Sequence, residues 1–305
     1  MTSHPDDTNR AVVVIVVTVL ALSLGDAVIK STSATFSLWQ IFVLRSLLVV
    51  PCLLLVIKQS SAVGQWMPLA PWWTIVRSGL LTLMWVSYYF SLAHVELSVA
   101  AAAYYTLPLF IMLFASYFLG DTIGVSGWVA ILIGFLGVVL ILEPRAENFN
   151  WYALLPLLSA IFYALAMILT RSRCRGEHVF VLSLWLNLTM LGAGLVATVF
   201  LLVVGVSVQH AAAQPFLLAG WSSLGIRELL SLLLLSVAII IGSVGAAYAY
   251  QRGKPATIAV FDFSYVGFAM IWGVLFFSEA PGLRGMAGVL LIVIAGVLAV
   301  RQAQE

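Results

Sequence analysis

Ten long runs of apolar residues constrain the fold of this chain more than any other feature. A membrane-spanning helix needs about 20 consecutive, mostly apolar residues, because the hydrocarbon core of a bilayer is about 30 Å thick. These runs are continuously apolar, so they favour helices over the alternating strands of a membrane barrel. They cover residues 11–30, 38–57, 72–91, 97–118, 125–142, 151–170, 179–204, 229–249, 255–277 and 282–300. We therefore predict an all-α membrane protein with ten transmembrane helices.

The composition is typical of a chain that is embedded in a membrane over most of its length. Of its 305 residues, 63% are hydrophobic and 9% are charged, and the mean hydropathy is +1.12. Soluble chains are about 45–50% apolar and about 25% charged. These values exclude a soluble enzyme, a nucleic-acid-binding protein and a disordered chain. They predict the lipid bilayer as the protein's surroundings and no nucleic-acid partner.

The basic residues predict the orientation of the spans. Nine lysine and arginine residues lie on the side of the N-terminus, four lie on the opposite side, and Arg45 falls inside a span. Cytoplasmic loops carry the excess of such residues. Both termini are therefore predicted to face the cytoplasm from the inner (plasma) membrane, with residues 1–10 as an N-terminal tail.

The two halves of the chain, residues 11–142 and 151–300, resemble each other. A shift of 158 residues places Asp121 on Glu279 and Gly127 on Gly285. Each half contains five of the predicted spans, and because five is odd, the second half is expected to lie inverted relative to the first. Two inverted five-helix repeats are typical of secondary transporters, whose substrate site lies near the bilayer midplane.

Four charged residues lie inside predicted spans and away from their ends, where charges are costly and usually face a cavity. At about 1.5 Å per residue, Asp26 and Arg45 lie at similar depths, and so do Arg77 and Asp262. Each pair is expected to form an ion pair, which is a structural interpretation. In the functional interpretation, Asp262 or Asp26 binds a proton or an amine, and an arginine receives a carboxylate. Lys30, near a helix end, is expected to reach water.

Aromatic residues within the spans supply the other predicted substrate contacts. A tyrosine hydroxyl inside a span needs a hydrogen-bond partner, which either a wet cavity or a neighbouring helix provides. The shift of 158 residues places Tyr104 on Asp262, so the turns at 104–106 and 262–264 are predicted to form one shared site. The predicted substrate-binding residues are Tyr89, Tyr104, Tyr105, Tyr163, Trp185, Asp262 and Tyr265.

Several segments resemble the EamA family of the drug/metabolite transporter superfamily. They are residues 91–108 (SLAHVELSVAAAAYYTLP) with Leu119-Gly120-Asp121, residues 256–265 (ATIAVFDFSY), residues 276–282 (FFSEAPG), and Arg45, which is similar to an arginine of that family's second helix. The resemblance implies a ten-helix carrier with a central cavity that moves small metabolites by alternating access. Pro108 has Val266 at the matching position of the second half, so a proline-dependent bend is expected in the first half only.

Motifs for catalysis are missing from the sequence. It contains no H-E-x-x-H, no G-x-S-x-G and no P-loop, so we predict no enzyme activity, no metal and no cofactor. The predicted function is a secondary transporter for a small metabolite, with export of an amino acid or related compound as the expectation. A carrier of a vitamin- or nucleotide-like compound is the alternative, and a channel or a non-transporting scaffold represents other classes. The sequence leaves open whether transport is coupled to protons and whether the protein is a monomer or a homodimer.

Overall fold

The computed structural model describes residues 5–59, 66–120, 124–142, 150–253, 258, 261–262, 264–279 and 282–302. Every regular element in these ranges is helical, which confirms the all-α prediction for them. The elements are α1 (Pro5–Thr32), α2 (Leu38–Gln59), α3 (Pro71–Leu92), α4 (Leu97–Tyr104), α5 (Leu107–Leu119), α6 (Val125–Leu142), η1 (Trp151–Leu154), α7 (Leu155–Ser172), α8 (Val179–Val204), α9 (Val208–Ala213), α10 (Pro215–Leu218), α11 (Ile226–Arg252), α13 (Ser264–Phe277) and α14 (Leu283–Gln302).

Six helices in the described part of the chain are long and apolar enough to cross a membrane. They are Asn9–Thr32, Leu38–Gln59, Val99–Phe118, Trp151–Ser172, Val179–Val204 and Ile226–Arg252. Three shorter apolar helices, within α6, α13 and α14, match further predicted runs. The remaining run corresponds to α3, whose buried side chains include Thr74, Arg77 and Ser78. The molecule is therefore an integral membrane protein with at least these six apolar helices.

Some helix boundaries differ from the predicted runs. The first helix begins at Pro5, inside the predicted tail 1–10. The run 97–118 is divided into α4 and α5, because Pro108 has no N–H with which to continue the helical hydrogen bonds. The Thr106 hydroxyl donates to the carbonyl of Ala103 at 2.9 Å and so satisfies a backbone group at this break. In the second half, residues 259–260 and 263 lie outside the described ranges, so the absence of a matching bend is untested.

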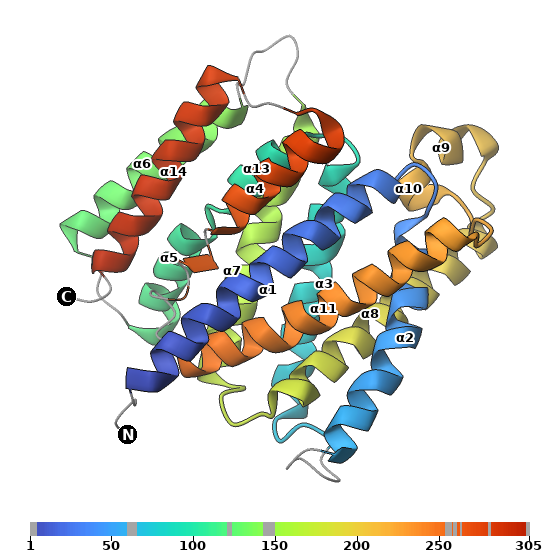
Figure 1. Cartoon of the computed structure of the whole chain (residues 1–305), viewed down its shortest axis with the longest axis horizontal. Coiled ribbons are helices and arrows are strands. Elements are labelled where there is room, and N and C mark those ends of the chain that lie inside the picture. The colour runs from blue at the N-terminus through green and yellow to red at the C-terminus, as the bar shows by residue number, and fades with distance from the viewer. Residues whose placement is uncertain are drawn as a thin grey trace.

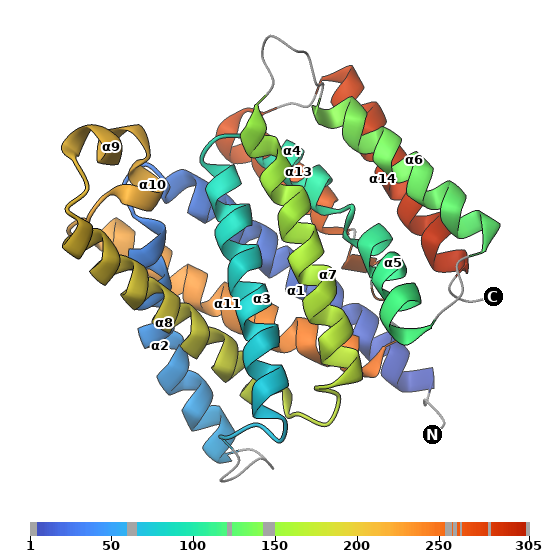
Figure 2. The same ribbon diagram turned by 180° about the vertical axis from the view of Figure 1, so that it is seen from behind.

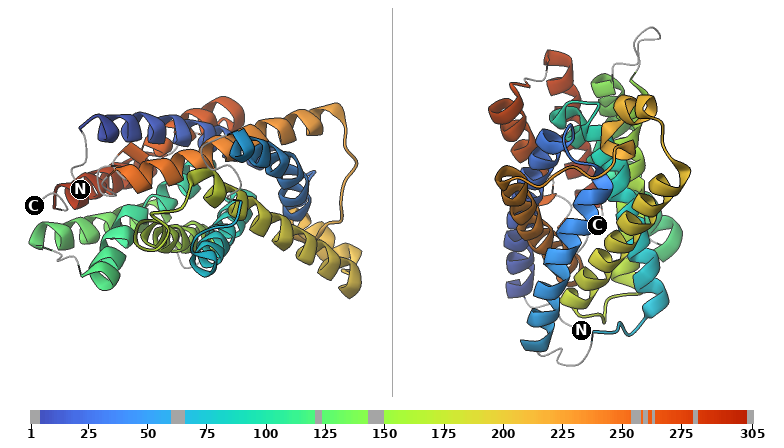
Figure 3. Two further views of the ribbon diagram at one scale, coloured as in Figure 1. Left: turned by 90° about the horizontal axis from the view of Figure 1, so that it is seen from below. Right: turned by 90° about the vertical axis from the view of Figure 1, so that its right-hand side faces the viewer.

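The helices form two layers (Figures 1 and 2). One layer contains α1, α11, α13 and α14, and the other contains α3, α5, α6 and α7, as the view from below shows (Figure 3). The pair α2–α8 lies at one edge of the molecule and the pair α6–α14 lies at the other (Figure 1). We call the end of the bundle where α1 begins the N-side, and the end where α1 finishes the far side.

When the chain is divided between α6 and η1, the helices of the first half and those of the second make similar contacts. Helix α1 packs on α11 and α13, and in the corresponding way α7 packs on α3, α4 and α5. The contact of α2 with α11 corresponds to that of α8 with α3. The pairs α2–α8 and α6–α14 each join helices at the same position in the two halves, and α4 of the first half also contacts α13 of the second. This pattern places a shared contact region between α1, α3, α4, α7 and α13.

The pair α6–α14 is the most closely packed, because glycines let the two backbones approach. A Cβ atom added at Gly137 would lie 2.7 Å from the carbonyl oxygen of Gly288 and 2.8 Å from the Ile292 side chain. Since backbone cannot move aside as a flexible side chain can, a substitution here has to separate the helices.

We expect Gly137→Ala to lower the free energy of unfolding by about 1–3 kcal/mol, the usual cost of overpacking. The matched control is Gly192→Ala in α8, where an added Cβ would meet no atom within 4 Å. Equilibrium unfolding in mixed detergent micelles measures both. Equal stability of the two variants would contradict the close α6–α14 contact.

Candidate functional site

A small cavity lies in the shared contact region between the two layers. Its volume is about 30 Å³, which is enough for one or a few water molecules and an order of magnitude below the roughly 300–1,000 Å³ of metabolite pockets. We call it the central cavity. It is lined by Leu22, Asp26, Met84, Trp85, Tyr88, Tyr104, Tyr105, Tyr163, Asp262 and Tyr265. Both halves of the chain contribute to this lining.

The first carboxylate of the cavity is that of Asp26 in α1, which is 2% exposed. The Tyr265 hydroxyl donates a hydrogen bond to Asp26 Oδ2. The Tyr88 and Tyr265 hydroxyl oxygens are 2.8 Å apart. Since Tyr265 has a single hydroxyl hydrogen, and Asp26 accepts it, Tyr88 donates to Tyr265. A short relay of two tyrosines from α3 and α13 therefore ends on the carboxylate of α1.

The second carboxylate is that of Asp262, which is equally buried. Tyr105 donates to its Oδ1 at 3.0 Å, and Tyr250 donates to its Oδ2 at 2.8 Å. Tyr105 follows α4 directly, at the helix break that Pro108 causes, whereas Tyr250 lies in the last turn of α11. The two oxygens of Asp262 thus accept one hydroxyl each, Oδ1 from the first half and Oδ2 from the second.

The two carboxylates are joined through a stacked pair of tyrosines. The rings of Tyr105 and Tyr265 lie 5.0 Å apart, with 27° between their planes. Tyr105 belongs to the first half and holds Asp262 of the second, while Tyr265 belongs to the second half and holds Asp26 of the first. The halves therefore bind each other by reciprocal hydrogen bonds, and every one of these polar groups is buried.

Arg45 does not form the expected direct ion pair with Asp26. Its Nη2 lies 3.0 Å from Met190 Sδ, and its guanidinium carbon lies 5.4 Å from the centre of the Phe42 ring. The Tyr89 hydroxyl interacts with both Asp26 and Arg45. The expectation of direct pairing was wrong because a tyrosine of α3 lies between two residues of similar depth.

Arg77 and Asp262 are not paired either. The Arg77 Nε donates to Thr170 Oγ1 at 2.6 Å, because α3 packs directly on α7. Asp262 instead meets Tyr105 and Tyr250. Within the described ranges, the ion-pair distance of 4 Å is reached between Lys30 and Glu279 and not at either buried arginine. Similar depth did not place these charges on facing helix surfaces.

Five of the seven predicted substrate-binding residues line the central cavity. Tyr89 is buried behind it, near Arg45. Trp185 lies elsewhere, and its indole N–H donates to the carbonyl of Trp66 at 3.1 Å on the N-side. Tyr250 was absent from the prediction because the predicted span stopped at residue 249, whereas α11 continues to Arg252. Tyr88 was left out of the predicted substrate-binding set although it is adjacent to Tyr89, since the sequence does not say which of two neighbours faces inward.

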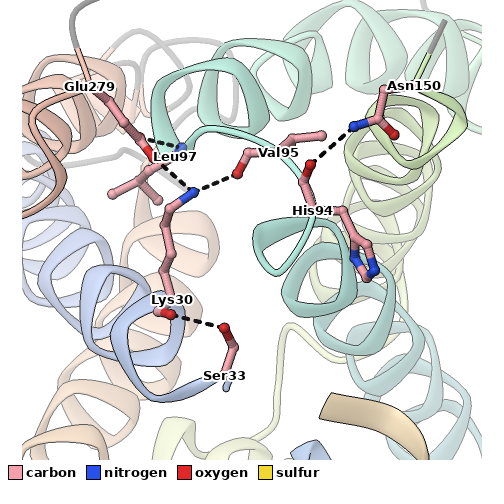
Figure 4. Close-up of polar contacts among 7 residues, drawn as sticks. All are labelled: Lys30, Ser33, His94, Val95, Leu97, Asn150 and Glu279. Carbon is pink, nitrogen blue, oxygen red and sulfur yellow. Dashed lines mark hydrogen bonds and ion pairs between the residues drawn. The ribbon is translucent and has the colours of Figure 1, made fainter. Parts of the chain in front are cut away.

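The far side of the bundle is closed by a polar cluster that Figure 4 shows. The Lys30 ammonium lies 2.9 Å from Glu279 Oε1 and donates to the carbonyl of Val95 at 2.6 Å. Glu279 Oε2 accepts the backbone N–H of Leu97 at 2.9 Å, at the start of α4. Lys30 was predicted to reach water; its ammonium is bonded to Glu279 and Val95, and its side chain remains 15% exposed. This cluster ties α1, the α3–α4 loop and the segment after α13 together. Asp121, which the shift of 158 residues places on Glu279, lies outside the described ranges.

Comparison with known proteins agrees with the transporter-like architecture. The sequence profile of the EamA-like transporter family matches residues 9–143. The riboflavin transporter of Rhizobium johnstonii is 31% identical over 234 residues, which are 76% of this chain and 70% of that protein. This chain belongs to the EamA-like transporter family. The predicted resemblance is confirmed, and the family and these relatives are transporters and not enzymes.

Other relatives of this family member differ in what they transport. The pseudopaline exporter of Pseudomonas aeruginosa is 26% identical over 294 residues, which are 94% of each chain. The S-adenosylmethionine uptake transporter of Rickettsia bellii is 33% identical over 101 residues, about a third of each chain. A crystal structure with a TM-score of 0.67 and 16% identity covers 99% of this chain and 100% of its own, and shows that the fold is shared.

We expect Tyr265→Phe to lower the free energy of unfolding by about 1–3 kcal/mol, because it leaves Asp26 and Tyr88 without their shared buried partner. Tyr117→Phe is the control, since Tyr117 is 81% exposed and its change is expected to stay within about 0.5 kcal/mol. Unfolding in mixed micelles gives both values. A Tyr265→Phe variant as stable as the wild type would contradict the relay.

Cys174, in the turn between α7 and α8, is predicted to resist alkylation. It is fully buried, and burial raises the pKa of its thiol above the usual value of 9.0. Because only the thiolate reacts, the rate of maleimide labelling at pH 7 should be more than about tenfold below that of an exposed thiol and should increase with pH. The comparison uses Cys52→Ser protein against Cys52→Ser/Cys174→Ser/Ser172→Cys protein. The new thiol of the second protein lies at the exposed last residue of α7. Equal labelling rates would contradict the burial.

Proposed function

We propose that this protein is a secondary transporter that exports a small zwitterionic metabolite, an amino acid or a related compound, through the central cavity by alternating access. The observation that carries the proposal is the pair of reciprocal carboxylate–tyrosine contacts between the halves. Two buried carboxylates meet in one cavity, and neither is neutralised by a direct ion pair. Ionisable groups placed in this way inside a membrane usually serve transport.

The proposed architecture has ten membrane crossings, arranged as two inverted repeats in residues 11–142 and 151–300. The matched sets of helix contacts support it, since α1–α11 corresponds to α7–α3. Five crossings in each half reverse the direction of the second repeat. The excess of lysine and arginine on the N-side supports cytoplasmic termini and an inner-membrane location.

Alternating access is proposed to act on the contacts between the halves. The far side is closed by Lys30 and Glu279, and the central cavity is too small for a metabolite in this state. A substrate can therefore enter only if the halves separate. Asp262 accepts a hydroxyl from each half, so a proton or an ammonium group that binds its carboxylate competes with these hydroxyls and loosens the contact.

The cavity chemistry supports a substrate with both charges and an apolar part. Asp262 and Asp26 provide sites for a cation. Arg45 and Arg77 are buried nearby, neither lies within 4 Å of a carboxylate among the described residues, and they provide positive charge for the substrate carboxylate. The aromatic lining also supports the second candidate, a flat vitamin- or nucleotide-like compound stacked on tyrosine rings. The names of the riboflavin and S-adenosylmethionine transporters agree with this second candidate.

Flux into proteoliposomes tests the proposal and separates it from other classes. The purified full-length protein is reconstituted, an inward or outward pH gradient is imposed, and uptake of radiolabelled amino acids, riboflavin and S-adenosylmethionine is followed. A carrier gives saturable flux and accelerated exchange. Fast, unsaturable flux would instead identify a channel, and no flux of any compound would favour a scaffold.

We expect Asp262→Asn to reduce uptake driven by the pH gradient at least about tenfold while exchange of substrate across the membrane persists, because the amide cannot carry a proton. Glu96→Gln is the control, since Glu96 is exposed and lies outside the central cavity. Both rates are measured on the same vesicle preparations. If Asp262→Asn retained the full pH-driven rate, Asp262 would have no part in coupling.

A further inference from the structure

A second and larger cavity lies on the N-side, apart from the central cavity. Its volume is about 350 Å³, which falls within the range of small-molecule sites. It lies between the segment before α3, the turn that joins α7 to α8, and the end of α11. None of its lining residues lines the central cavity. Its chemistry is therefore separate from that of the carboxylate–tyrosine cluster.

The floor of the N-side cavity is fixed by hydrogen bonds. The Glu177 carboxylate, 6% exposed, accepts the backbone N–H groups of Leu69 at 2.9 Å and Ala70 at 2.6 Å. The Gln251 amide nitrogen donates to the carbonyls of Cys174 at 3.1 Å and Glu177 at 2.9 Å. These bonds hold the turn between α3 and α11, and both oxygens of Glu177 are already engaged. A rigid floor of this kind is what a preorganised site requires.

Positive charge lines the walls of this cavity, and the one carboxylate among its described lining residues is that of the hydrogen-bonded Glu177 in the floor. Arg175 and Arg252 both line it, and neither has a carboxylate within 4 Å among the residues that the structure describes. The guanidinium carbon of Arg252 lies 4.7 Å from the centre of the Tyr248 ring, one helical turn earlier. The N-terminus of α8 also borders the cavity, and its dipole adds partial positive charge.

The remaining walls are apolar. Met67 and Leu69 present side chains that are 54% and 70% exposed, and Val179 and Val181 lie opposite in the first turn of α8. A ligand that binds to both the arginines and the apolar walls needs an anionic group and a compact apolar body. Inorganic anions satisfy only the first.

We propose that the N-side cavity is a binding site for an organic anion, a carboxylate or phosphate ester with an apolar body, that is bound between Arg175 and Arg252. Two sources share this chemistry. One is a soluble metabolite, and the other is the headgroup of an anionic phospholipid, because the cavity lies at the end of the membrane-crossing helices. The site does not depend on what the central cavity transports.

Phenyl phosphate is the probe for this site, and its neutral analogue phenol is the control ligand. A ligand that binds the folded state raises the melting temperature in a concentration-dependent way. In the full-length protein in neutral detergent, we expect phenyl phosphate to raise it and phenol to leave it unchanged. In Arg175→Gln/Arg252→Gln protein the apparent Kd should increase by about tenfold or more, since charge-assisted hydrogen bonds are lost.

The matched control variant is Arg173→Gln. Arg173 comes from the same turn, but its guanidinium stacks on Trp73 at 5.0 Å and does not line the cavity, so phenyl phosphate should bind this variant as it binds the wild type. Asp262→Asn should also bind normally, which separates this proposal from the transport mechanism. The proposal is overturned if phenyl phosphate does not bind wild type, or binds the double variant and Arg173→Gln equally.

Nanodiscs distinguish the two sources. If phenyl phosphate binds at least about tenfold more weakly in discs of phosphatidylglycerol than in discs of phosphatidylcholine, and the double variant removes this difference, the natural occupant is a lipid headgroup. If affinity is the same in both discs, the site takes a soluble anion.

Discussion

The hydrogen bonds between two buried carboxylates and tyrosine hydroxyls from opposite halves are the interaction on which the rest of this structure depends. Breaking a buried ion pair by removing one partner costs about 3–5 kcal/mol, whereas a hydrogen bond to a charged group contributes about 1.5–3 kcal/mol net. Asp26 and Asp262 are held by Tyr265, Tyr105 and Tyr250 and not by arginines. A proton or an ammonium group can therefore replace these tyrosine hydrogen bonds. Thermal motion and substrate binding can supply the free energy needed to break them.

Hydrogen bonds also join the two halves at both ends of the bundle. Glu279 accepts the first N–H of α4 on the far side, and Glu177 accepts N–H groups at the start of α3 on the N-side. Both glutamates come from the second half of the chain, and both helices belong to the first. Helix N-termini attract negative charge, so these contacts join the halves at both ends while the tyrosines join them at the centre. Lys30 adds an ion pair on the far side alone, which makes the two ends unequal.

Much of the helical framework could be predicted from the sequence, because a run of apolar residues is a local property. The break at Tyr105 and Thr106 follows from Pro108, and the location of the site at this break was predicted with Tyr104, Tyr105, Asp262 and Tyr265 together. The ion pairs could not be predicted correctly. Depth in the membrane follows from counting residues, but the direction in which a side chain points depends on the rotation of its helix against its neighbours.

The sequence by itself determined that this chain is helical and embedded, that charged and tyrosine side chains lie within its spans, and that it resembles the EamA family. Only the tertiary structure decided which of those side chains meet. Arg77 bonds to Thr170 and not to Asp262 because α3 packs on α7. Tyr250 reaches Asp262 because α11 extends beyond its apolar run. Hydrophobicity acts on each segment separately, whereas a hydrogen bond needs two helices in one relative orientation, which packing alone provides.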